Sequence, residues 1–503
     1  MPDMHLFGTR SPSRYLAAAL SLAVANCAAI PDANPGQEAM VSSQKNIIII
    51  LADDLGYGDV GAFGNDGIPT PNIDLLATEG VKFVNGYATA AVCAPSRAGL
   101  LAGQHQARFG WEFNPVGRDE SHGIPPEIET LPELAKTAGY RTAIIGKWHV
   151  GQAEGFHPLD RGFDEFYGVL GGATAYFPDG YQEVEADMGP VDEAQSRARH
   201  PIWHNREKVD PEEYLTNVFT DKAIDYINQP SDQPFFLYFA PNAPHTPLQA
   251  AQRYADRFPE ETDQFRLTYM AMVSALDDEV GRIRNALIES GKAENTIVIF
   301  LSDNGCASYI HGACSNLPLE GYKAYPWEGG IRVPFIVWAP GSIAPGQTET
   351  DPVSSIDILP TTMAVIGADT PKTADGVDIF SGADLAHRPL FWRMGPNHAV
   401  RLGDWKLLVV NKSDRVQDLS NILGEPVPDG VPAEVSPLGQ YVLLFNLAED
   451  PDESNNLAET HPEKVAALQK LFEEWDQSNK DPLFTSRRQF RTEVDGRKVQ
   501  LFN

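Results

Sequence analysis

The stretch from residue 46 to residue 54 reads Asn-Ile-Ile-Ile-Ile-Leu-Ala-Asp-Asp. Its apolar part, 46–51, has the length of a strand and is rich in isoleucine, which indicates a strand buried on both faces. Similar short runs recur at 142–145, 235–239, 297–301 and 333–338, with helical patterns between them. This alternation predicts an α/β fold with helices on both sides of a large, mainly parallel sheet.

The segments between the apolar runs carry helical periodicity. Apolar residues at helical spacing predict helices at 73–79, 128–138, Gln264–Glu289 and 357–366. Residues 178–212 are polar and acidic without periodicity, so we expect a long surface insertion there. The whole region from residue 44 to residue 386 is predicted to form one large domain.

The C-terminal part of the chain has a different pattern. The runs 399–410 and 441–446 are typical of antiparallel strands, and a loop rich in Pro, Gly and Asp separates them. A helical pattern follows at 462–477. The sequence therefore predicts a smaller α+β domain over residues 387–503.

The composition is that of a folded globular protein with a strong negative charge. The 503 residues include 39 Lys and Arg against 69 Asp and Glu, a formal net charge of −30. Nucleic-acid binders usually have the opposite balance, so we expect no nucleic-acid partner. The four cysteines are too few for a disulfide scaffold. We also expect no transmembrane segment, because no apolar run after residue 30 could span a bilayer.

The N-terminus has the pattern of an export signal. Two arginines precede an apolar stretch that is too short for a transmembrane helix, and Ala23-Val24-Ala25 fits a cleavage site. We expect a signal peptide at 1–25 and a linker at 26–43, which predicts a periplasmic or secreted protein. Lipid attachment at Cys27 is the alternative, but Asn26 stands where a lipobox has a small residue.

Polar residues follow four of the predicted strands. In an open α/β sheet the ligand lies beyond the carboxyl ends of the strands, so we expect these residues to meet at one edge. Singly, an Asp after a strand is often a helix cap, and a lone His is often structural. Four such strand ends together indicate an active site. In chain order the residues are Asp53 and Asp54, Lys147 and His149, His245, and Asp303 and Asn304.

Four of these residues carry oxygen ligands for a metal ion. Asp53, Asp54, Asp303 and Asn304 supply three carboxylates and one amide oxygen, which suit Ca²⁺ or Mg²⁺ and disfavour Zn²⁺. Adjacent carboxylates packed together without a cation would repel each other, which also favours a metal. We expect calcium, because it tolerates a looser oxygen cage than magnesium.

A short motif around Cys93 carries the most specific signal in the chain. It reads Cys93-Ala-Pro-Ser-Arg97 and continues as Ala-Gly-Leu-Leu-Ala-Gly. From the residues alone, Cys93 could be a buried core cysteine or a thiolate nucleophile. The motif resembles the signature of the type I sulfatases, Cys-x-Pro-Ser-Arg followed by a Thr/Ala-Gly segment. In that family a maturation enzyme oxidises the cysteine to formylglycine.

The resemblance runs from about residue 45 to residue 340 and more loosely to the C-terminus. Matching positions are 53–59, 70–77, 139–149, 244–245, 302–305 and Lys323. The resemblance implies the alkaline phosphatase-like fold and a sulfatase that depends on formylglycine and one Ca²⁺. It also implies that the calcium is held by Asp53, Asp54, Cys93, Asp303 and Asn304.

The resemblance further implies a mechanism. One hydroxyl of the hydrated aldehyde attacks sulfur, and the other later expels sulfate as the aldehyde re-forms. His245, assisted by Lys323, protonates the leaving oxygen, and His149 takes the proton of the second hydroxyl. The cationic side chains that stabilise negative charge are Arg97 and Lys147.

The substrate is expected to be a sulfated carbohydrate. Residues 103–114 resemble bacterial sulfatases that act on sulfated polysaccharides such as those of marine algae, and export fits a polymeric substrate. A formylglycine-generating enzyme is the expected maturation partner. The alternatives are an arylsulfatase with a small substrate and, in the same superfamily, a phosphatase or phosphodiesterase. Enzymes of the latter kind use two zinc ions and more histidine ligands than these motifs offer.

Two further groups of residues allow more than one interpretation. Cys306 and Cys314 lie near the metal motif, and in an oxidising compartment a disulfide is as plausible as two free thiols. Six residues in loop-like stretches could contact a sulfated sugar, although each alone is more typical of surface or packing. They are Arg108, Trp111, Trp203, His204, His311 and Arg393.

Overall fold

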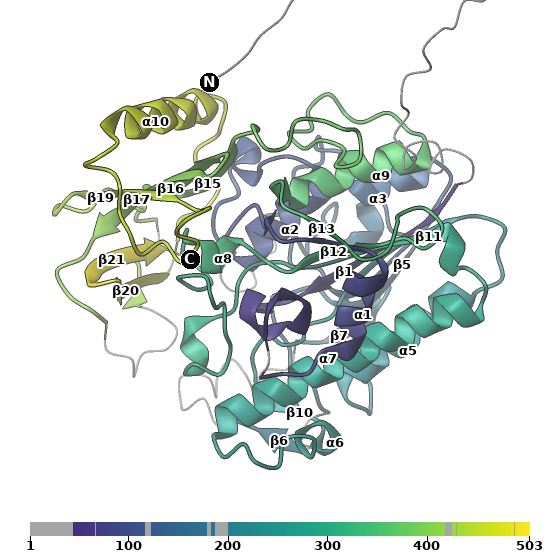
Figure 1. Ribbon diagram of the computed structural model, residues 1–503. Coiled ribbons are helices and arrows are strands. Elements are labelled where there is room, and N and C mark those ends of the chain that lie inside the picture. Colours follow the sequence, from purple (N-terminus) through teal and green to yellow (C-terminus); the bar gives the residue numbers. More distant parts are fainter. Residues whose placement is uncertain are drawn as a thin grey trace, which may run out of the picture.

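A computed structural model describes residues 44–65, 67–115, 122–178, 183–186, 200–417, 425–428, 430–486 and 488–502. The predicted signal peptide (1–25), the linker (26–43) and Cys27 lie outside the described residues. Two large β-sheets, each with its own helices, organise this part of the chain, and two small two-stranded sheets accompany them (Figure 1). No helix within these ranges is both long and apolar enough to cross a membrane.

A ten-stranded mixed sheet forms the centre of the larger part. Its five middle strands run parallel, and antiparallel strands join at both sides, so the predicted α/β sheet is confirmed. In spatial order the strands are β13 (Gln347–Glu349), β2 (Val81–Phe83), β12 (Phe335–Trp338), β11 (Thr296–Ser302), β1 (Asn46–Ala52), β9 (Phe235–Ala240), β4 (Arg141–Lys147), β5 (Glu165–Val169), β7 (Ile202–His204) and β8 (Glu207–Val209).

Two expectations about this sheet need correction. The run 333–338 contributes β12, which is antiparallel to β11, so the strand does not extend the parallel order. The segment 178–212 is more than a surface insertion, because β7 and β8 within it form a hairpin that pairs with β5. Neither strand has the apolar periodicity of a buried strand, since they lie at the edge of the sheet and are partly exposed.

Helices cover both faces of this sheet (Figure 1). Ile48 and Ile50 of β1 face a core with one set of helices, and Ile47 and Ile49 face the opposite core. This is why the opening run of the sequence lacks polar alternation. One face carries α1 (Pro71–Glu79), α5 (Leu215–Asn228) and α7 (Gln264–Glu289), and the other carries α2 (Cys93–Ala102), α3 (Leu131–Thr137) and α9 (Ile358–Ile366).

The four predicted helices are present as α1, α3, α7 and α9, whereas periodicity did not reveal α2 or α5. Helix α2 is buried along its whole length and has no polar face to set a period. Shorter elements complete this part of the chain: β3 (Gly86–Tyr87), β6 (Val184–Glu185), β10 (Gln249–Ala250), β14 (Val353–Ser354), α6 (Gln252–Ala255) and α8 (Glu328–Ile331).

The second sheet is antiparallel and has seven strands. Together with its helix it confirms the predicted α+β character of the C-terminal part. The run 399–410 is two strands, because Gly403 adopts φ +59° and turns the chain between them. The sheet comprises β15 (Leu390–Met394), β16 (Asn397–Leu402), β17 (Trp405–Lys412), β21 (Arg497–Phe502), β20 (Arg488–Val494) and β18 (Glu425–Pro426), and β19 (Gln440–Asn446) pairs with β17.

The two faces of the second sheet have different partners. Helix α10 (Pro462–Asp476) packs on one face through Leu468 and Phe472. The other face packs against the segment that precedes α2, where Ala91 and Val92 share a core with Trp392. The second sheet therefore packs against the residues that lead into the N-terminal end of α2.

Candidate active site

Four neighbouring strands bring their carboxyl ends to one edge of the first sheet. They are β11, β1, β9 and β4, which pair in parallel. Backbone hydrogen bonds join the loops beyond these ends: Asp53 N donates to Ala243 O (3.2 Å), and Asp303 N donates to Ala52 O (3.0 Å). The residues expected at this edge from the sequence are thus brought together by the order of the strands.

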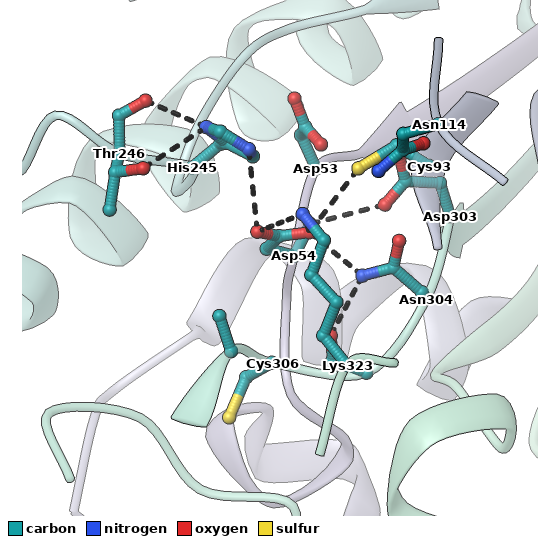
Figure 2. Close-up of polar contacts among 12 residues, drawn as sticks. Asp53, Asp54, Cys93, Asn114, His245, Thr246, Asp303, Asn304, Cys306 and Lys323 are labelled. Carbon is teal, nitrogen blue, oxygen red and sulfur yellow. Dashed lines mark hydrogen bonds and ion pairs between the residues drawn. The ribbon is translucent and has the colours of Figure 1, made fainter. Parts of the chain in front are cut away.

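Asp54 lies at the centre of the oxygen-bearing side chains (Figure 2). Its backbone N–H donates to Oδ1 of Asp303 (3.2 Å), and its own Oδ1 accepts from Nδ2 of Asn304 (2.7 Å). Sγ of Cys93 lies 3.7 Å from the same oxygen. Ligand atoms of Asp53, Asp54, Cys93 and His245 all lie within 4.8 Å of one another.

This group of oxygens fits a hard divalent cation. Oδ1 of Asn304 is buried and has no hydrogen-bond partner among the described residues, so a metal ion would supply the contact it lacks. Burial and the nearby Asp53 raise the pKa of Asp303 to about 6, and a cation bound beside it would lower that pKa again. The residues that could hold the ion are Asp53, Asp54, Asp303 and Asn304.

Three buried cations lie against the three carboxylates. Burial alone would raise the pKa of Asp53 and of Asp54, but the cations, with Lys147 and Lys323 foremost, lower both pKa values below their ordinary range. The site is therefore a compact network of opposite charges rather than an acidic patch. The ion pairs are Lys147–Asp53 (2.7 Å), Arg97–Asp303 (2.8 Å) and Lys323–Asp54 (2.7 Å).

Cys93 is the first residue of α2 and is 1% exposed. Val92, the residue before it, cannot cap the helix, and instead Oδ1 of Asn114 accepts a hydrogen bond from the backbone N–H of Ala94 (2.9 Å). Burial raises the pKa of the Cys93 thiol to about 12, because its effect outweighs the lowering by Lys147 and Lys323, and Asp303 and Asp54 add to the rise. An unmodified thiol in this position is protonated and unreactive at neutral pH.

The two predicted catalytic histidines lie in different surroundings. Nδ1 of His245 lies 2.7 Å from the carbonyl oxygen of Thr246, and a carbonyl only accepts, so this nitrogen carries the proton. Nε2 of the same ring faces Asp54 Oδ2 at 3.6 Å. His149 lies two residues beyond Lys147 with its ring against Gly172, where a Cβ would meet Nε2 at 2.6 Å. Burial lowers the pKa of both histidines.

The structure also adds residues that the motifs did not single out. Asn114 holds the start of α2, and the hydroxyl of Tyr309 donates to Asp54 Oδ2 (3.3 Å). Tyr309 lies in the loop that a disulfide between Cys306 and Cys314 closes, which resolves the alternatives for these two cysteines. The sequence could have pointed to Tyr309, because this residue lies between the two cysteines directly after the second metal motif at 302–305.

Three of the possible sugar-contacting residues have structural roles instead. Trp111 is fully buried. Arg108 pairs with Asp375 (3.0 Å), and Arg393 pairs with Asp476 (2.5 Å) next to the second sheet. His311, in contrast, is exposed in the disulfide-closed loop.

These contacts indicate which chemistry the residues at this edge can perform. Fixed cations favour an anionic substrate, the histidines can carry protons, and residue 93 faces the carboxylates from the start of a helix. The fold and the site place the chain in the class of hydrolases that cleave anionic esters at the edge of a sheet covered by helices on both faces.

Comparison with known proteins identifies the family within that class. The family model described as Sulfatase matches residues 45–368, and the chain belongs to this family. It is 32% identical over 458 residues to N-acetylgalactosamine-6-sulfatase of Homo sapiens, covering 85% of this chain and 84% of the relative. It is 32% identical over 462 residues to arylsulfatase A of Homo sapiens, covering 86% and 87%. The protein is therefore a sulfuric ester hydrolase.

A solved structure agrees with this assignment. The structure described as Ps i-CgsB in complex with k-i-k-neocarrahexaose is similar with a TM-score of 0.77 and 32% sequence identity. The similarity covers 88% of this chain and 95% of that chain. It therefore includes both sheets, and the alkaline phosphatase-like fold implied by the sequence motifs is confirmed.

Proposed function

We propose that this sulfatase is an exported enzyme that hydrolyses sulfate esters of carbohydrates, with formylglycine at position 93 and one bound calcium ion. The observation that carries the proposal is the place of Cys93. It begins a buried helix, points toward Asp54 and lies near the fixed cations Arg97, Lys147 and Lys323. The signal-peptide pattern at 1–25 supports export to the periplasm or the medium.

The surroundings of Cys93 argue against a simple thiolate nucleophile. Burial holds the pKa of the thiol far above neutral pH, so an unmodified Cys93 would be protonated at pH 7. A formylglycine hydrate would supply two hydroxyls on one carbon, one to attack sulfur and one to drive release of sulfate. The motif from Cys93 to Arg97 supports conversion by a formylglycine-generating enzyme as maturation partner.

Asp53, Asp54, Asp303 and Asn304, with the oxygen of residue 93, would hold the calcium ion. Bound there, calcium would supply Lewis-acid polarisation of a substrate or nucleophile oxygen. Arg97 and Lys147 are anchored on these same carboxylates, so they would keep fixed positive charge beside the sulfate without having to reorganise.

His245 in its protonated form and Lys323 are the proposed proton donors to the leaving oxygen, since the neutral His245 ring holds its one proton on Nδ1 against Thr246. Both contact Asp54, and the ring of His245 also lies against Thr246 (Figure 2). His149 is proposed to accept the proton of the second hydroxyl, since desolvation of its ring and the nearby cations lower its pKa and favour its neutral form. The two histidines would then act at opposite stages of the reaction.

The names of relatives support a carbohydrate substrate. One relative is named for N-acetylgalactosamine 6-sulfate, and one solved structure contains k-i-k-neocarrahexaose. We propose a sulfated carbohydrate of the algal polysaccharide type. An arylsulfatase acting on small molecules is the alternative, because arylsulfatase A is similarly related.

The test compares protein from two hosts, one with and one without a formylglycine-generating enzyme. Turnover is measured on 4-nitrophenyl sulfate, N-acetylgalactosamine 6-sulfate and k-i-k-neocarrahexaose, and mass spectrometry follows the peptide that contains residue 93. We expect activity to rise with the fraction of that peptide that is lighter than its cysteine form. Full activity with an unmodified thiol would overturn the role of formylglycine, and turnover of the aryl ester alone would favour the alternative substrate class.

A further inference from the structure

A cavity of about 370 Å³ lies between the disulfide-closed loop that follows β11 and the second sheet. Its size is typical of cavities that hold small ligands. The loop contributes one wall, and strand β20 contributes the opposite wall. The residues used in the argument are Tyr309, His311, Tyr325, Phe490, Arg491 and Thr492.

Tyr309 connects this cavity to the catalytic edge. Its ring lines the cavity, and its hydroxyl donates to Oδ2 of Asp54 (3.3 Å). The ammonium group of Lys323 lies 6.0 Å from the centre of the same ring, and the backbone N–H of Lys323 donates to Cys306 O (2.8 Å). The cavity therefore begins one side chain away from the carboxylate that faces Cys93.

The lining of the cavity has the chemistry of a carbohydrate site. Tyr325 and Phe490 present aromatic surface, on which the apolar face of a sugar ring can pack. Arg491 pairs with Glu425, which also accepts from Arg415 (2.9 Å), so the guanidinium is anchored in the wall. A guanidinium has five N–H donors, and an anchored one can still donate to sugar oxygens.

We propose that this cavity binds the sugar ring next to the one that carries the scissile sulfate. The sulfated ring must place its ester against residue 93, and Tyr309 both contacts Asp54 at that position and lines the cavity, so a ring joined to the sulfated one would fill the cavity. The inference rests on the proposed carbohydrate sulfatase function. Under this proposal Arg491 and the aromatic residues Tyr309, Tyr325 and Phe490 recognise the sugar next to the sulfated one.

Two variants test this site from different directions. Arg491→Gln removes the donor, and Thr492→Trp fills the cavity with a larger side chain. Arg497→Gln, in the same hairpin but outside the lining, is the matched control. Circular dichroism and the urea unfolding midpoint show whether each variant folds as the parent does.

The measurement is the Kd of k-i-k-neocarrahexaose, determined by calorimetry with the purified full chain. We expect the Kd to rise at least about tenfold in Arg491→Gln, as loss of a charge-assisted hydrogen bond would give, and similarly in Thr492→Trp. The Arg497→Gln control should bind as the parent does. Unchanged Kd in both cavity variants, or no binding by the parent, would overturn the proposal.

Failure of the proposed function would give a different result. Turnover of 4-nitrophenyl sulfate by the parent enzyme reports on the sulfatase chemistry and does not require the cavity. A parent that cleaves this ester while the cavity variants bind the hexasaccharide normally would contradict the sugar site alone. A different result would contradict the function and support the sugar site. In that case the parent would be inactive on every sulfate ester but would bind the hexasaccharide, and the two cavity variants would lose that binding.

Discussion

The buried ion pairs between the two sheets make a prediction about stability. Lys406 of β17 lies between Glu328 of α8 (2.9 Å) and Glu453 (2.8 Å), and all three side chains are fully buried. Glu453 also accepts from the backbone N–H of Glu328 (2.6 Å), and Tyr87 donates to Glu328 (2.6 Å). Lys406→Met removes the only cation in this group that contacts both carboxylates within the described residues.

The expected loss follows from the burial of the pair. Removal of one partner of a buried ion pair costs about 3–5 kcal/mol, because the remaining charge is left without compensation in a dry interior. Here burial already raises the pKa of Glu453 to about 7, so below that pH the carboxyl can take up a proton and reduce the loss. We therefore expect the loss in Lys406→Met to be larger at pH 8 than at pH 6.

Urea denaturation followed by tryptophan fluorescence measures this effect at both pH values, since Trp392 and Trp405 lie in the second sheet. Lys470→Met is the control, because Lys470 forms an exposed pair with Glu474 (3.6 Å) that contributes less than about 0.5 kcal/mol. The double variant Lys406→Met/Glu453→Gln should recover part of the loss. A loss in Lys406→Met no larger than in the control would refute the reasoning.

Four further predictions concern the site and the pH dependence of stability. Cys93→Ser should lose nearly all turnover and accumulate a sulfated adduct visible by intact-mass analysis, since a serine ester has no second hydroxyl; normal turnover would contradict the mechanism. Removal of divalent ions with EDTA should abolish activity and lower the unfolding temperature, with recovery on calcium addition, whereas stoichiometric zinc without calcium would speak against the assigned metal. His245→Ala should lower turnover of a sugar sulfate by about 10²–10⁴-fold but turnover of 4-nitrophenyl sulfate far less, because the leaving group of the aryl ester needs no proton. His149→Ala should lower turnover of both substrates alike, and an equal loss on both substrates in His245→Ala would assign the acid role to Lys323. Burial raises the pKa of Asp277 from 3.8 to about 6, so the folded protein binds this proton more tightly than the unfolded chain. The stability that this proton contributes to the folded protein is present below pH 3.8 and is lost as the pH rises through 6, a fall of up to about 3 kcal/mol in the free energy of unfolding. Asp277→Asn should remove this pH dependence from the free energies of unfolding measured in urea between pH 4 and 7.

Much of the fold was readable from local patterns. The run that opens the sheet became β1, and the long amphipathic pattern became α7 with the bounds predicted, Gln264–Glu289. Both signals are local, because a strand buried on both faces must be apolar throughout and a half-buried helix must repeat its apolar residues at helical spacing. The residue types beyond four strand ends likewise pointed to one edge, since parallel neighbours end together.

Other features depend on contacts between distant parts of the chain. No local pattern places Asn114 against the start of α2 or Lys406 between two glutamates, because these pairings join segments that approach only after the sheets pack. No local pattern predicts the direction of β12 either, because it is set by pairing with β11. Strands β7 and β8 likewise depend on pairing with β5 at one side of the sheet.

The sequence by itself determined the α/β class, the strand ends that carry chemistry and the motif around Cys93, since each depends on neighbouring residues or on one short spacing. Only the tertiary structure decided that Tyr309 contacts Asp54 and that its loop and the second sheet line one cavity. It also decided that three cations balance three carboxylates there. The physical reason is that burial and charge pairing are properties of the packed interior, where residues far apart in the chain share one environment of low dielectric constant.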